Sequence, residues 1–190
     1  MRFEDIDFLG QGRFTKIDDT VRYLARKIAR RSDGNSSLRN ISDYLREEMV
    51  FAPKSKSAEF RKRSASEILI SRHYTGCTDI ALVFAILSRA RGIPSRYVET
   101  FKEKWLNDKN ARGIHGHIFV DILDGKEWRA YEPLRGFTKD GDYCLCGEKF
   151  SEVGKGLDFS EVYIKEDGVY RDEPVNLQNL DLAVKLFKKA

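Results

Sequence analysis

The feature that constrains the fold most is an apolar run that begins directly after a small polar turn. Thr75-Gly76-Cys77-Thr78-Asp79 leads without a gap into Ile80-Ala81-Leu82-Val83-Phe84-Ala85-Ile86-Leu87. Apolar residues recur there with a period of about 3.6 residues, which predicts a buried helix. Thr75 is the expected N-cap, and Gly92 and Pro94 are expected to end the helix.

Cys77 lies in the first turn of this predicted helix. The unpaired N–H groups and the positive end of the helix dipole favour a thiolate over a thiol at such a position. Cys77 is therefore a candidate nucleophile, provided that a base stands nearby. The alternative is purely structural, because a free cysteine is often just a small buried hydrophobic residue.

A predicted hairpin supplies the base. Residues 117–123 and 128–132 alternate like two half-buried strands, and Asp124-Gly125 between them is a favoured pair for a two-residue turn. Counting outward from that turn pairs Leu123 with Lys126 and places His117 opposite Glu132. Residues opposed in this way lie close enough for an imidazole–carboxylate hydrogen bond.

A cysteine, a histidine and an acid of this kind match the chemistry of thiol acyl transfer, in which the thiolate attacks a carbonyl and the imidazole moves the proton. His117 is the first choice for the base, followed by His115, which would have no acid opposite it. Glu132 is the first choice for the acid, followed by Asp121, which shares the face of His117 but lies four residues further along the strand. His73 is interpreted as a loop residue or as a residue on the oxyanion side of the site.

The sequence resembles the transglutaminase-like superfamily in these same segments. The resemblance covers about residues 40–135 and rests on Gly76-Cys77-Thr78-Asp79, Leu87 to Val98 with Gly92-Ile93-Pro94-Ser95-Arg96, residues 117–121, and Tyr131-Glu132-Pro133. It implies an α+β fold with a papain-like core: helices come first, an antiparallel sheet follows, and the nucleophile stands at a helix N-terminus.

The resemblance also implies residue roles and an activity. Cys77 would be the nucleophile, His117 the general base and Glu132 the third member, where the family normally has aspartate. The implied activity is that of a cysteine protease or amidase, acting on amide bonds of peptides or proteins through a Cys77 thioester; hydrolysis is favoured over acyl transfer to an amine. The alternative is a catalytically silent module that binds protein or nucleic acid.

Three aromatic residues are candidates for substrate binding. Trp105 stands in a long polar segment, residues 102–114, before the histidine strand, where it would form a wall of the cleft or cover an edge of the core. Tyr74 precedes the cysteine turn. Phe119 follows the histidine by two residues, where the resemblance places an aromatic residue.

The flanking segments predict further elements. Amphipathic helices are expected from Asp18 to Arg31 and around Leu38 to Leu45, and a short helix capped by Ser64 or Ser66 is expected before the cysteine turn. The basic stretch 54–63 is expected to be an exposed loop. Residues 95–101 and 143–146 predict strands, and residues 176–189 predict a closing helix.

Bulk properties set the remaining expectations. The 190 residues are expected to form one domain, with an N-terminal arm over 1–17 and a C-terminal extension over 136–190. The formal net charge of +4 leaves nucleic-acid binding through the basic segments as a less favoured alternative to a peptide or protein substrate. Three cysteines and no apolar leader predict a cytoplasmic protein without membrane attachment. No cofactor and no metal are expected, because the pair Cys144 and Cys146 lacks a second pair of ligands.

Overall fold

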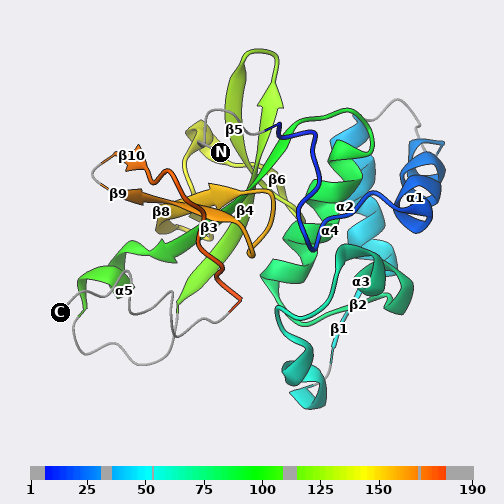
Figure 1. Cartoon of the computed structure of the whole chain (residues 1–190), viewed down its shortest axis with the longest axis horizontal. Coiled ribbons are helices and arrows are strands. Elements are labelled where there is room, and N and C mark those ends of the chain that lie inside the picture. The colour runs from blue at the N-terminus through cyan, green and yellow to red at the C-terminus, as the bar shows by residue number, and fades with distance from the viewer. Residues whose placement is uncertain (1–6, 31–35, 53, 109–114, 167, 179–190) are drawn as a thin grey trace.

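The computed structural model describes residues 7–30, 36–52, 54–108, 115–166 and 168–178 (Figure 1). Its helices are α1 (Asp19–Ala29), α2 (Ser37–Glu48), α3 (Ala65–Ser71), α4 (Cys77–Arg89) and α5 (Glu103–Asn107), with 3₁₀ turns η2 (Lys54–Glu59) and η3 (Lys139–Gly141). Its strands are β1 (Val50–Phe51), β2 (His73–Tyr74), β3 (Ser95–Lys102), β4 (Gly116–Asp124), β5 (Glu127–Glu132), β6 (Gly136–Phe137), β7 (Cys144–Leu145), β8 (Glu148–Gly156), β9 (Val162–Glu166) and β10 (Val169–Tyr170).

The predicted N-terminal helices form, and side chains cap them. Asp18 accepts a hydrogen bond from the backbone N–H of Val21 at the start of α1, 3.0 Å away. Ser64 and Glu67 form a reciprocal capping box at the start of α3, so both N-terminal donors are satisfied. The closing helix predicted for 176–189 lies almost entirely outside the described residues, as does the start of the N-terminal arm.

Helix α4 lies at the centre of the molecule. Figure 1 shows it between the sheet on one side and α1, α2 and α3 on the other. Residues Ala81 to Leu87 are fully buried, and their main core includes Ile118, Val120 and Ile122 of β4. The all-apolar run therefore follows from contact with other elements on every side.

Within the described residues, the larger sheet follows the order β10-β9-β8-β3-β4-β5-β6, with β7 paired to β8. The neighbouring strands in this order are antiparallel. The small second sheet pairs β1 with β2 in parallel, directly before the cysteine turn. The structure is therefore the α+β fold predicted from sequence, with helices first and an antiparallel sheet after them.

The register of the β4–β5 hairpin differs by two residues from the prediction. Asp124 pairs with Glu127 and Leu123 with Trp128, so the turn residues are Gly125 and Lys126. Gly125 has φ +66° at the first turn position, which is where a type II′ turn takes glycine. Because side chains alternate with a period of two, this shift leaves His117 and Glu132 on the same face, but diagonal to each other.

Strand β8 was not predicted from the sequence. Gly154 and Gly156 lie where β8 runs against β9, and a Cβ on Gly156 would come 1.8 Å from the carbonyl oxygen of Glu161. The glycines therefore mark a close approach of two backbones.

The basic stretch 54–63 is also not simply an exposed loop. It contains η2 and turns inward at Arg61, whose side chain is 2% exposed. Across the described residues, none of the helices is long and apolar enough to cross a membrane.

Candidate active site

Helix α4 begins at its lower end in Figure 1, above β1 and β2, and Cys77 is its first residue. The N-cap is Gly76 rather than the predicted Thr75, and no side-chain hydrogen bond caps the helix. Instead, Asp79 Oδ2 accepts hydrogen bonds from Thr75 N at 2.8 Å and Thr75 Oγ1 at 2.9 Å. The Phe60 ring lies 3.1 Å from the position of a Cβ on Gly76, so a larger residue there would crowd this ring.

His117 and Glu132 stand together on the sheet. His117 Nε2 lies 3.3 Å from Glu132 Oε1, while Glu132 Oε2 accepts a hydrogen bond from Leu134 N at 3.0 Å. The longer glutamate side chain spans the diagonal that the two-residue shift creates. Thr100 Oγ1 donates to the His117 carbonyl oxygen at 2.7 Å, beside an irregularity in the pairing of β3 with β8, where Glu99 pairs with Gly154 and Thr100 with Glu152. The histidine backbone is thereby fixed beside an irregularity of the kind often found at active sites.

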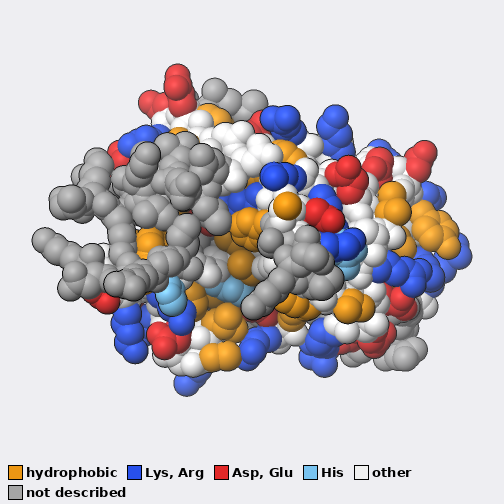
Figure 2. All heavy atoms as spheres, turned by 90° about the horizontal axis from the view of Figure 1, so that it is seen from below, with side chains coloured by type: hydrophobic (Ala, Val, Ile, Leu, Met, Phe, Trp, Pro, Cys, Tyr) orange, Lys and Arg blue, Asp and Glu red, His pale blue; other side chains and the backbone are white. Residues whose placement is uncertain are grey.

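The imidazole of His117 also forms a side-chain hydrogen bond with Cys77, so the three predicted catalytic residues are connected. Burial, the largest single influence, lowers the pKa of His117, but the hydrogen bonds and charges of Cys77 and Glu132 together raise the pKa to about 9. His117 is therefore protonated at neutral pH. Seen from below, both histidine and hydrophobic side chains reach the surface of the molecule (Figure 2).

Comparison with known proteins identifies the family of this chain. The model of the transglutaminase-like superfamily matches residues 22–133, which include Cys77, His117 and Glu132. This chain belongs to the transglutaminase-like superfamily. No curated protein sequence matches it.

The fold is also found in a solved structure. A protein from Cytophaga hutchinsonii, described as a putative cysteine protease, shares 22% identity with this transglutaminase-like chain at a TM-score of 0.56. The match covers 82% of this chain and 49% of that one, so the present chain spans about half the length of that protein. At this identity the likeness establishes the fold alone.

The other candidates for acid and base have different partners in this transglutaminase-like structure. Asp121 accepts a hydrogen bond from Tyr143 and pairs with Lys155 Nζ at 2.7 Å, so its carboxylate is occupied away from His117. His115 is exposed. His73 Nε2 lies 3.1 Å from Glu59 Oε2, in a network below α4.

The three predicted substrate-binding aromatics occupy different environments. Trp105 is buried in α5, with its ring centroid 4.9 Å from that of Phe101, which favours the core-edge alternative. Phe119 is fully buried, and its ring meets the His117 ring at 5.0 Å in an edge-to-face contact, so it supports the imidazole. Tyr74 is half-buried, and its ring centroid lies 5.4 Å from that of the exposed Phe51.

Sequence reasoning missed a charged group beside the nucleophile. Arg61 Nη2 pairs with Glu99 Oε1 at 2.5 Å, and Tyr97 donates to Glu99 Oε2 at 3.0 Å, with all three side chains buried. Cys77 interacts electrostatically with Arg61 and Tyr97. The sequence did contain a signal for this pair. Glu99 lies on the apolar face of an alternating strand, and a buried carboxylate requires a cationic partner.

Proposed function

We propose that this transglutaminase-like protein is a thiol hydrolase that cleaves amide bonds of peptides or proteins. The observation that supports the proposal best is the hydrogen-bonded series Cys77–His117–Glu132 at the start of α4. The raised pKa of His117 supports it further, because a protonated imidazole beside a cysteine favours the reactive thiolate.

The proposed reaction has two steps. In the first, Cys77 Sγ attacks the amide carbonyl carbon, His117 gives its proton to the departing amine, and a thioester forms. In the second, His117 takes a proton from a water molecule, whose oxygen attacks the thioester. The products are a carboxylic acid and the regenerated cysteine. The backbone N–H of Cys77, at the start of α4, is the proposed first donor to the oxyanion.

Glu132 is proposed to orient His117 and to stabilise its positive charge. One carboxylate oxygen contacts His117, and the other is held by Leu134 N, so the side chain is fixed at both ends. This arrangement supports a working acid in the position where the family normally has aspartate.

Hydrolysis of the thioester is favoured over transfer of the acyl group to an amine. The fold shared with the Cytophaga hutchinsonii protein, described as a putative cysteine protease, supports this choice. We also propose a reducing, cytoplasmic setting, which agrees with Cys77, Cys144 and Cys146 all being free thiols.

Selective alkylation tests the proposal. Iodoacetamide at neutral pH is expected to modify Cys77 faster than Cys144 or Cys146, although Cys146 is the more exposed thiol. His117→Ala should remove this preference. Equal labelling of the three cysteines in the wild-type protein would contradict the proposal.

The alternative is a silent binding module. It is favoured by the basic surface of α1, where Arg26, Lys27 and Arg30 line a hollow with Tyr23. It predicts salt-sensitive association with an acidic polymer such as single-stranded RNA, together with no selective labelling of Cys77. Absence of association at low salt would remove the nucleic-acid version of this alternative.

A further inference from the structure

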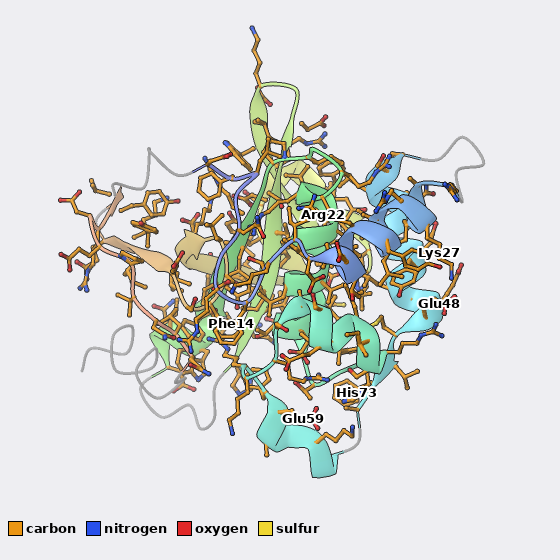
Figure 3. The ribbon with its side chains drawn as sticks, turned by 45° about the vertical axis from the view of Figure 1, so that its right-hand side comes forward. Phe14, Arg22, Lys27, Glu48, Glu59 and His73 are labelled. Atoms are coloured by element: carbon orange, nitrogen blue, oxygen red, sulfur yellow. The ribbon has the colours of Figure 1, made fainter. Side chains whose placement is uncertain are left out.

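Arg63 is the centre of a polar network at the N-terminal end of α4. Its Nη1 atom lies 3.0 Å from both Ser71 Oγ and His73 Nε2, and 3.3 Å from Glu59 Oε2. Its Nη2 atom donates to the His73 carbonyl oxygen at 3.1 Å and to Asp79 Oδ2 at 2.6 Å. Figure 3 shows Glu59 and His73 side by side in this region. One side chain thus connects α3, η2 and β2 to the first turn of α4.

Asp79 transmits this connection to the nucleophile. The carboxylate oxygen that receives Arg63 also accepts both hydrogen bonds from Thr75. Thr75 and Asp79 enclose Gly76 and Cys77, so the turn that carries the sulfur is closed by one carboxylate. The backbone of Gly76 is extended, and no side-chain hydrogen bond caps the helix, so this carboxylate restrains the turn from its far side.

The same carboxylate raises an electrostatic problem. Asp79 is fully buried and lies two residues after Cys77, where an unpaired negative charge would oppose a thiolate. Arg63 is 11% exposed and neutralises that charge at 2.6 Å. Two further charged pairs interact with Cys77 or belong to the same site, Arg61 with Glu99 and His117 with Glu132. The charge on Arg63 therefore offsets that of Asp79 beside Cys77.

We propose that Arg63 and Asp79 are positioning residues for Cys77, in which Asp79 fixes the turn before the nucleophile and Arg63 cancels its charge. This inference rests on the proposed thiol chemistry. If the ion pair were purely structural, loss of either partner should have the same kind of effect. Here the loss of Asp79 should favour the Cys77 thiolate, and the loss of Arg63 should disfavour it.

Paired substitutions with a pH readout test this inference. The rate of Cys77 alkylation by iodoacetamide is measured from pH 5 to pH 10 for the folded wild-type protein, Asp79→Asn and Arg63→Gln. Asp79→Asn keeps an acceptor for Thr75 but leaves Arg63 positive, so the pH midpoint should move down. Arg63→Gln leaves Asp79 negative, so the midpoint should move up. Each shift is expected to reach up to about one pH unit.

Two control variants complete the test. Arg63→Lys retains the charge, and its midpoint should stay close to that of the wild type even if its thermal stability falls. Arg72→Gln removes a nearby charge from a side chain that is 63% exposed and should leave the midpoint unchanged. Midpoints that move in the same direction for Asp79→Asn and Arg63→Gln, or that do not move, would overturn the inference.

The two proposals fail in different ways. If His117→Ala slows alkylation while the Arg63 and Asp79 variants leave the midpoint unchanged, the positioning inference is wrong and the thiol chemistry stands. If His117→Ala leaves alkylation of Cys77 unchanged, the proposed function itself is wrong.

Discussion

The two ends of α4 are built in opposite ways. At its C-terminal end, Arg89 is buried and donates to the carbonyl oxygens of Ser95 and Leu157 and to Thr15 Oγ1. At its N-terminal end, Cys77 is half-buried and the helix has no side-chain cap. Polar groups join segments of the fold at both ends, but the C-terminal end is closed by the buried Arg89, whereas the N-terminal end leaves backbone donors beside a thiol. We infer that the first end serves stability and the second serves reactivity.

The largest expected effect is at the N-terminal end. Cys77→Ala should lower amidase activity by at least about 10⁴-fold, because the nucleophile is lost, while changing the free energy of unfolding by less than about 1 kcal/mol. A peptide-hydrolysis assay and urea unfolding measure the two effects. Cys144→Ala is the matched control and should retain activity. Undiminished hydrolysis by Cys77→Ala would remove the assignment of the N-terminal end to catalysis.

Arg89→Met should have the converse effect at the C-terminal end. It removes the Arg89 donor from the buried carbonyl oxygen of Ser95 and from the partly buried one of Leu157, so the free energy of unfolding should fall by about 3 kcal/mol or more. Activity per folded molecule should change little. Arg91→Met, at an exposed position of the same helix end, should cost less than about 1 kcal/mol in urea unfolding. Similar losses for the two variants would contradict the stability role of Arg89.

Glu132→Gln tests the role of the acid on the sheet side of Cys77. It should lower kcat/KM by about 10²-fold, because the imidazolium loses its negative partner. The pKa of His117 should fall from about 9 towards its ordinary value, so activity should decline at a lower pH on the alkaline side. The control Asp121→Asn removes a carboxylate paired with Lys155 and should leave that decline in place. An unchanged pH profile in Glu132→Gln would contradict the assignment of Glu132.

The stability of the protein should also depend on His117. Its pKa in the folded protein, about 9, lies above its ordinary value of 6.5, so protonation favours the folded state. The stabilising contribution is complete below about pH 6.5 and is lost as the pH rises through about 9. Chemical unfolding of the wild type and His117→Ala should therefore differ by about 1–3 kcal/mol more at pH 6 than at pH 10. A difference that grows with pH would have the wrong sign.

The smallest expected effect concerns substrate contact near the reactive end. Phe51 is 63% exposed, and its partner Tyr74 precedes Cys77 by three residues, within about 10 Å along the chain. We expect Phe51→Ala to raise KM for an extended peptide about fivefold, the equivalent of about 1 kcal/mol, with kcat unchanged. Val169→Ala, an exposed residue on β10, is the control for peptide kinetics. A change in kcat alone would contradict a binding role for Phe51.

Much of the fold could be predicted because local signals agreed with the tertiary structure. The uninterrupted apolar run of α4 and the capping residues of α1 and α3 each specify their own element. His117 and Glu132 could be predicted to share a face, since the alternation of β4 and β5 fixes the face whatever the turn.

The remaining features depend on contacts that local patterns do not encode. The two-residue shift in register arose because Gly125 takes the first turn position, whereas the Asp-Gly pair suggested the second. Arg61 reads as one more surface cation until Glu99 is placed opposite it. The need for glycine at position 156 becomes evident only when the backbone of β9 is placed against it. For Arg61 the deciding partner is distant in sequence, whereas Gly125 and Gly156 depend on the local path of the backbone, which the residue types alone do not specify.

The most direct test of the central claim is mass spectrometry of the acyl adduct. Wild-type protein is quenched in acid within seconds of mixing with an activated ester of a short peptide, and the adduct is mapped after digestion. The account predicts one acyl group on Cys77, absent from Cys77→Ala and accumulating more slowly in His117→Ala. Acylation spread equally over Cys77, Cys144 and Cys146, or unaffected by loss of the imidazole, would contradict it.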